Sequence, residues 1–280
     1  MINQFTRKER YKTIAIISLG AVLEWFEFCL YGYLASFLSI LFFPKEHPTI
    51  AMISVFGIFS ASYLMRPLGG FIIGSIGDRF GRQRAIKLSM ILMCFPMLIM
   101  AIMPTYNSAG IWAALILLFA RMLQGFSVGG EYTGILVTLT ESAAPQRRGF
   151  TNAMAGLASQ IGVILSATTV WILSSILSKT QMLDYGWRIA FIIGFILAVG
   201  STIMQKKAKE SPFFKELQKK ATLCEKPLRS AIRGPKMPLV WTFVLTGYVG
   251  IAYYMMATYL PNKFINIRFF HINKSMLISV

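Results

Sequence analysis

Charge is scarce in this sequence, and acidic charge is the scarcer kind. Only 14% of the 280 residues are charged, against about a quarter in a typical soluble domain, and 28 Lys and Arg face 11 Asp and Glu. The two histidines and three cysteines lack the spacing of metal ligands or of a disulfide framework. No nucleophile–base set or phosphate-binding loop is found either. These deficits exclude an ordinary soluble domain, and we expect no enzyme, no metal and no cofactor.

Long apolar runs occupy most of the chain instead. Mean hydropathy is +0.60, and several windows of about 20 residues carry almost no charge, which is enough to cross a bilayer as a helix. The first run contains Glu24 and Glu27, whereas the apolar region of a signal peptide is shorter and uncharged, so we expect a retained first span. We predict an all-α membrane protein with spans at 13–38, 51–76, 86–104, 110–139, 150–177, 187–205 and 238–261, and the start of an eighth at 275–280.

Basic residues gather in alternate loops between these runs. Residues 1–12, the loops after the second and fourth spans, and the segment after the sixth span hold most of them. By the positive-inside rule this asymmetry places the N-terminus and the segment after the sixth span in the cytoplasm, although Lys263, Arg268 and Lys274 lie on the other side. The net charge of +17 therefore indicates membrane topology rather than a nucleic-acid partner.

The layout divides the chain into three parts. Residues 1–205 contain six spans, residues 206–236 form a basic cytoplasmic connector, and residues 237–280 begin a second half. Transporters built from two halves begin with this arrangement. The connector starts with a basic, amphipathic stretch and contains several prolines, which favours an interfacial segment followed by irregular chain.

Ionisable groups inside the first span are the most informative feature. A charged side chain near the bilayer centre costs roughly 2.5–3.5 kcal/mol on insertion, so it normally faces protein or water. Gly20, Glu24, Glu27 and Tyr31 recur at helical spacing and share one stripe. Two carboxylates that repel each other at membrane depth suit a group that binds and releases a proton. The alternative is a structural carboxylate paired with a basic side chain.

The fourth span carries a second set of polar residues. Arg121 and Gln124 share a face, and an arginine at this depth needs a partner, for which Glu24 or Glu27 is the natural candidate. Glu131 lies about 15 Å further towards the cytoplasm by helix rise, and its different direction predicts a separate gate or pairing. The glycines of this span have small-xxx-small spacing, which predicts close helix packing.

Two features of the second span complete the candidate residues. Arg66 precedes Pro67 and either lines the pathway or pairs with a carboxylate; the residues leave both roles open. The loop that follows is a tight, charged cytoplasmic turn, in which we expect Asp78 to cap the next helix and to pair with the arginines. This signature loop contains Gly74, Asp78, Arg79, Gly81, Arg82 and Arg84.

These residues resemble known transporter families. The loop from Gly74 to Arg84 looks like the signature loop of the major facilitator superfamily, and Arg121, Gln124 and Gly125 resemble its second motif. Six further motifs resemble the metabolite:proton symporter family, and within it the proline/betaine transporters, over residues 15–261. They are EWFEF at 24–28, RPLGG at 66–70, GFSVGGEYTG at 125–134, RRG at 147–149, GWR at 186–188 and ESPFF at 210–214.

The resemblance implies a proton-driven symporter that imports a small polar solute across the inner membrane of a bacterium. It implies a role in proton coupling for Arg121 and a lock on the outward-facing state for Asp78, and Glu27 stands where relatives usually have Asp. A zwitterion such as proline or glycine betaine fits a site that holds both carboxylates and Arg121. A dicarboxylate such as 2-oxoglutarate is the alternative.

Length is the main departure from the family pattern, because family members have twelve spans in two halves. We therefore expect a C-terminally truncated chain that works with a missing C-terminal half or by self-association. A truncated remnant that inserts without transporting is one alternative. A membrane scaffold or receptor that uses the basic connector to bind lipid headgroups or a partner is another.

Overall fold

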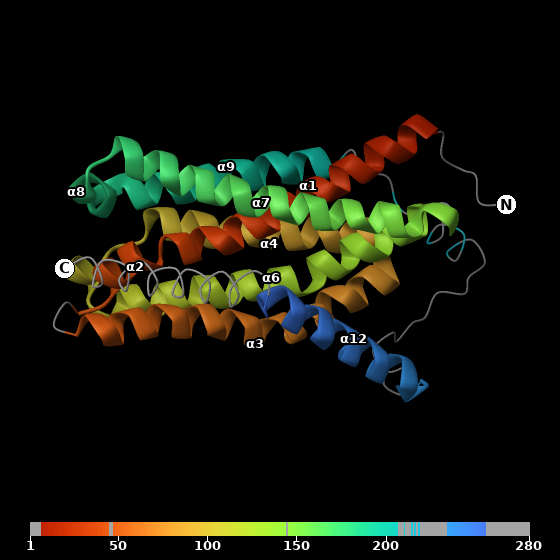
Figure 1. Ribbon diagram of the computed structural model, residues 1–280, viewed down its shortest axis with the longest axis horizontal. Coiled ribbons are helices and arrows are strands. Elements are labelled where there is room, and N and C mark those ends of the chain that lie inside the picture. The colour runs from red at the N-terminus through yellow and green to blue at the C-terminus, as the bar shows by residue number, and fades with distance from the viewer. Residues whose placement is uncertain are drawn as a thin grey trace, which may run out of the picture. The chain divides into compact units, whose positions relative to one another are not determined.

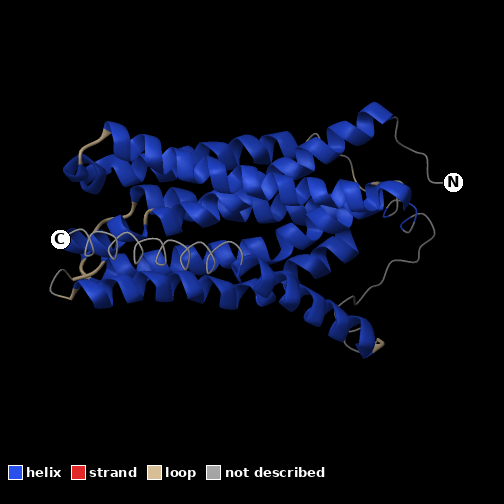
Figure 2. Cartoon of the chain, viewed as in Figure 1, coloured by secondary structure: helices blue, strands red, loops and turns tan. Residues whose placement is uncertain are grey.

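Helices form the regular structure throughout the described part of the chain (Figure 2). The computed structural model describes residues 7–44, 47–143, 145–206, 210, 214, 216, 218 and 234–255 (Figure 1). The chain divides into two compact units, residues 1–227 and 228–280, and each unit is described by itself.

Among its described residues, the first unit has six helices long and apolar enough to cross a membrane. Its α-helices are α1 (Arg7–Tyr33), α2 (Ala35–Phe42), α3 (Pro48–Phe80), α4 (Arg82–Ile102), α5 (Tyr106–Ala109), α6 (Ile111–Ser142), α7 (Arg148–Ile176), α8 (Lys179–Gln181) and α9 (Trp187–Gln205). Short 3-10 and π segments, Pro145–Arg147 and Met182–Gly186, precede α7 and α9. The six predicted spans are confirmed with small shifts at their ends. The first differs most, because the helix breaks at Leu34 before α2 continues.

The second unit contributes one described helix, α12 (Lys236–Tyr254). It begins two residues before the predicted seventh span, and its apolar stretch, Lys236–Ala252, is shorter than those of the six spans. The predicted end of the seventh span, the start of an eighth at 275–280 and most of the connector at 206–236 lie outside the described residues.

Helices that are distant in sequence pair within the first unit (Figure 1). α3 packs along α6, α1 packs along α7, and α4 lies against both α6 and α9. Two apolar clusters fill the interior, one around Phe26 and Trp187 and the other around Ile17 and Ile135. On α6 the segment 121–131, which carries the buried charges, lies between the two clusters.

Glycines set the distance between α3 and α6. A Cβ atom added at Gly125 would overlap the carbonyl oxygen of Ser62, and one added at Gly129 would overlap that of Arg66. Gly69 on α3 is packed against the α6 main chain in the same way. The two main chains therefore touch, as in small-xxx-small interfaces of membrane helices. The packing role predicted for the glycines of the fourth span is confirmed.

Candidate functional site

Four ionisable side chains are buried near the middle of two spans. Glu24 and Glu27 belong to α1, Arg121 and Glu131 belong to α6, and each is 4% exposed or less. Gln124, almost one turn after Arg121, is buried with them. Charges persist at such depth when other charges or hydrogen bonds compensate them. The contacts of each residue therefore indicate what the group does.

Gln124 connects α1 with α6. Its Nε2 donates a hydrogen bond to Oε2 of Glu27 over 3.3 Å, and its Oε1 accepts one from Nη1 of Arg121. Within the described residues no ion pair joins Arg121 directly to Glu24 or Glu27. Arg121 therefore reaches its expected carboxylate partner through an intervening amide. The charges of Glu27 and Arg121 also interact across this amide.

Aromatic rings close the other side of Arg121. Its guanidinium carbon lies 4.3 Å from the ring centroid of Tyr31 and 5.1 Å from that of Phe59. Such cation–π contacts contribute about 0.5–2 kcal/mol each and offset part of the cost of burying the charge. The Tyr31 hydroxyl donates to the carbonyl oxygen of Val55 over 3.0 Å. Side chains from α1, α3 and α6 thus meet at this arginine.

Glu131 belongs to the same buried group. An added Cβ at Gly20 of α1 would lie 3.3 Å from Oε1 of Glu131, so the glycine leaves room for this carboxylate. Neither carboxylate oxygen has a hydrogen-bond partner among the described residues. Glu24 and Glu27 are near enough to act on Glu131 electrostatically. Protonation of one member of this group therefore changes the electrostatic energy of the other two.

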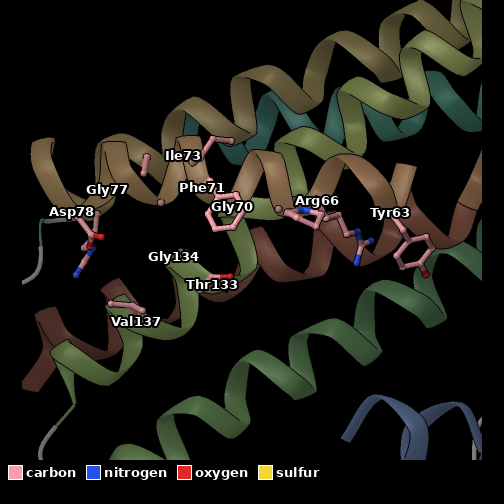
Figure 3. A pocket seen from close by; sticks show the side chains of 16 residues that line it. Tyr63, Arg66, Gly70, Phe71, Ile73, Gly77, Asp78, Thr133, Gly134 and Val137 are labelled. Carbon is pink, nitrogen blue, oxygen red and sulfur yellow. The ribbon is translucent and has the colours of Figure 1, made fainter. Parts of the chain in front are cut away.

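A cavity of about 690 Å³ lies between α3 and α6 (Figure 3). Tyr63 and Arg66 line one end, and Asp78 and Arg82 line the other. Glycines and apolar side chains form most of the wall between these ends. Arg66 is only partly buried, so it is accessible from the cavity, whereas Arg121 is enclosed.

Arg66 also packs against aromatic rings. Its guanidinium carbon lies 4.5 Å from the ring centroid of Tyr63 and 4.7 Å from that of Phe28, and its charge acts on Glu24. Of the two roles that the sequence left open, Arg66 lines a cavity, and no ion pair joins it to a carboxylate among the described residues. Tyr63 and Phe59 were not predicted, although Phe59, Tyr63 and Arg66 have the spacing of one helix face.

The signature loop forms an ion-pair network at the turn between α3 and α4. Arg82 pairs with Asp78 and, through Nη2, with Oε1 of Glu141 over 3.3 Å. The expected pairing of Asp78 with an arginine is confirmed. Gly74 lines the cavity, and Arg79 and Arg84 are exposed. Gly81, the remaining residue of the loop, stands at the turn between the two helices.

The prediction that Asp78 caps the next helix is wrong. Gly81 stands at the N-cap of α4 with φ +119° and offers no side chain, and Oε2 of Glu210 accepts a hydrogen bond from the Gln83 backbone N–H over 3.1 Å. Asp78 precedes the turn and is bound to Arg82. The carboxylate of Glu210 occupies the space that a side chain at Gly81 would need.

Six span-length helices around three buried carboxylates and a buried arginine are typical of one half of a membrane transporter. The sequence matches the sugar (and other) transporter family over residues 13–257, and the chain belongs to that family. This assignment confirms the resemblance to the major facilitator superfamily.

Curated relatives confirm the resemblance to proline/betaine transporters. The chain is 35% identical over 263 residues to the proline/betaine transporter of Escherichia coli (strain K12). The matched region covers 90% of this chain and 52% of that protein. It is 34% identical over 260 residues to the glycine betaine/proline/ectoine/pipecolic acid transporter OusA of Dickeya dadantii (strain 3937), with 90% and 52% covered. A putative proline/betaine transporter of Staphylococcus aureus (strain MSSA476) is 33% identical over 267 residues, with 93% and 56% covered. The chain thus spans about half the length of these relatives.

Solved structures agree on the fold. The xylose transporter XylE from E. coli in a partially occluded inward-open conformation matches with a TM-score of 0.69 and 18% identity, over 81% of this chain and 54% of that one. The proton:xylose symporter XylE bound to 6-bromo-6-deoxy-D-glucose matches with a TM-score of 0.70 and 17% identity, over 82% and 51%. This likeness concerns the fold alone, and it confirms the predicted N-terminal half of a major facilitator fold.

Proposed function

We propose that this chain is the N-terminal part of a proton-coupled symporter that imports a small zwitterionic solute, such as proline or glycine betaine. In this proposal it lies in the inner membrane of a bacterium with its N-terminus in the cytoplasm, as the loop charges favour. The relatives named proline/betaine transporter support the substrate class. The observation that carries the proposal is the buried chain from Glu27 through Gln124 to Arg121.

Glu27 is the proton-binding group in this proposal. When ionised, its carboxylate accepts the hydrogen bond from Gln124 and balances Arg121 across the amide. When protonated, the carboxyl group loses its charge and the hydrogen bond weakens, which leaves the buried charge of Arg121 less compensated. The two protonation states therefore favour different arrangements of α1 and α6. A proton can shift a conformational equilibrium only through such a difference between states.

Charge balance in the buried group favours a zwitterion over a dicarboxylate. Glu24 interacts with Arg66, Glu27 interacts with Arg121, and Glu131 interacts with both other carboxylates. Three carboxylates and two guanidinium groups give a formal charge of −1 when all are ionised. One bound proton neutralises the group, and a zwitterion leaves it neutral. A dicarboxylate would add two negative charges at a poorly solvated site, where unpaired charge is costly. Dicarboxylate:proton symport is therefore the weaker alternative.

Alternating access requires two halves that rock around a central site. The six described spans supply one half. A further part of the same polypeptide, a separate chain or a second copy of this chain would supply the other. Within that assembly we assign the lock on the outward-facing state to the network of Asp78, Arg82 and Glu141, because it ties α3 and α4 to the end of α6.

Uptake of labelled proline and glycine betaine tests the proposal. Cells that lack their own carriers would express the 280-residue chain, and an immunoblot of the membrane fraction would verify its presence. We expect uptake above the vector control that a protonophore abolishes. Protein in the membrane without uptake would contradict transport by this chain and favour a remnant that inserts only. Uptake of 2-oxoglutarate in place of both zwitterions would contradict the substrate class.

A further inference from the structure

We propose that Arg66 binds the carboxylate of the transported solute and selects solutes that carry a single carboxylate. This inference rests on the proposed function and names the residue that recognises the substrate. Glu24, Glu27, Arg121 and Glu131 are buried away from the cavity between α3 and α6, whereas Arg66 lines it (Figure 3). A solute in the cavity can therefore contact this guanidinium.

No protein acceptor engages the guanidinium of Arg66 among the described residues. Tyr63 and Phe28 hold the guanidinium with their rings, but rings offer no oxygen to its N–H groups. Its Nε is buried and has no hydrogen-bond partner among the described residues, and no carboxylate there forms an ion pair with it. A guanidinium can donate two parallel hydrogen bonds to one carboxylate. A ligand carboxylate would supply the acceptors that this side chain lacks.

Arg66 is also held in place before a ligand arrives. Its carbonyl oxygen packs against Gly129, where an added Cβ atom would overlap it, so the helix contact fixes the main chain. The ring contacts with Tyr63 and Phe28 then fix the far end of the side chain. Binding to a preorganised group loses less conformational entropy than binding to a mobile one. Arg66 therefore has the geometry of a binding residue.

The other arginines near the cavity are already engaged. Arg121 is fully buried, donates to Gln124 and does not line the cavity. Arg82 lines the far end of the cavity, but it pairs with Asp78 and Glu141. Some of their N–H groups also have no partner among the described residues, namely Nε of both and Nη2 of Arg121. Arg66 differs from both because it lines the cavity and donates to no protein acceptor there.

Glu24 sets the limit of one carboxylate. Its carboxylate is near enough to Arg66 for the two charges to interact, and its Oε2 is buried without a hydrogen-bond partner. Glu24 does not line the cavity, but in its ionised form it would repel a second carboxylate bound near Arg66 and attract a substituted ammonium. The pair of Arg66 and Glu24 thus favours a solute with one carboxylate and one cationic nitrogen.

Binding of L-proline and L-prolinol to the purified chain in lipid nanodiscs tests this inference. Prolinol keeps the ring and the ammonium and replaces the carboxylate with a hydroxymethyl group. We expect Arg66→Gln to weaken proline binding by about 10- to 100-fold, the range for a lost charge-assisted hydrogen bond. Prolinol binding should change by less than about threefold, and Arg66→Lys should restore part of the proline affinity.

Arg188→Gln is the matched control. Arg188 is also a partly buried arginine against a ring, with its guanidinium carbon 4.4 Å from the Trp187 centroid, and it does not line the cavity. We expect its loss to leave the affinity for both ligands unchanged. Size-exclusion profiles of all variants establish that the fold is retained.

The outcomes separate this inference from the proposed function. Retained preference for proline in Arg66→Gln would overturn the inference, and so would equal losses for both ligands, because a structural role predicts them. A wild-type chain that does not prefer proline would also overturn it, while proton-driven uptake would still support the proposed function. If the chain prefers proline over prolinol through Arg66 but shows no uptake, the result would support the inference and contradict the proposed function.

Discussion

Glutamine at position 27 would keep the shape of the buried side chain and remove its ionisable proton. In Glu27→Gln the amide oxygen can still accept the hydrogen bond that Gln124 now gives to the carboxylate over 3.3 Å. A hydrogen bond to a neutral acceptor is about half as strong as one to a charged acceptor, so we expect stability to change by about 1 kcal/mol. The variant should therefore fold and insert, and its defect should be functional.

The size of that defect follows from the proton that Glu27 is proposed to carry. If one proton accompanies each solute, a pH difference of one unit supports about tenfold accumulation, because a tenfold ratio corresponds to about 1.4 kcal/mol. Without the proton, the pH gradient no longer acts on the solute. Accumulation in Glu27→Gln should fall to a ratio of about one, while exchange of labelled for unlabelled proline continues.

Proteoliposomes with an imposed pH gradient measure both quantities. Glu27→Asp is the matched control, since it keeps a proton-binding group one methylene shorter and should retain accumulation. Asp184→Asn removes an exposed carboxylate outside the buried group and should have no effect. Accumulation by Glu27→Gln in proportion to the pH gradient would refute the assignment of Glu27.

Three further substitutions test the architecture around the site. Gly125→Val would force α6 away from the α3 main chain, so we expect the free energy of unfolding to fall by about 1–3 kcal/mol. The melting temperature should fall with it, and an unchanged melting temperature would contradict the close contact. Gly81→Ala would place a side chain at φ +119° and in overlap with Glu210, so we expect its free energy of unfolding to fall by about 1–3 kcal/mol. Gly74→Ala is the control, because its added Cβ meets nothing within 4 Å, and it should have the melting temperature of the wild type. Tyr31→Phe removes the 3.0 Å hydrogen bond to Val55, so the free energy of unfolding should fall by about 0.5–1.5 kcal/mol while proline uptake is retained. Loss of uptake by a stable variant would show that the hydroxyl has a further role.

Features that depend on local sequence could be predicted. Apolar windows of span length located the six helices, because a bilayer requires about 20 consecutive apolar residues whatever the neighbours are. The stripe of Glu24, Glu27 and Tyr31 followed from helical periodicity alone, and all three side chains are buried. The glycine spacing of the fourth span predicted a close helix contact without naming the partner helix.

Features that depend on which helices meet could not be predicted. The bridge from Gln124 to Glu27 joins residues 97 positions apart, and the ring of Phe59 reaches Arg121 because α3 packs on α6. The cap of α4 shows the same difficulty, since Glu210 lies 127 positions from Gln83. Local reasoning assigned that cap to Asp78, whose carboxylate binds Arg82 in the folded chain.

Proton movement driven by the solute tests the central claim most directly. Proteoliposomes that contain the 280-residue chain and a trapped pH-sensitive dye would receive an inward gradient of proline or glycine betaine, with no initial pH difference. The account predicts acidification of the interior that depends on the solute and is absent in Glu27→Gln. Solute entry with no change in internal pH would contradict proton coupling, and no entry of either solute would contradict transport by this chain.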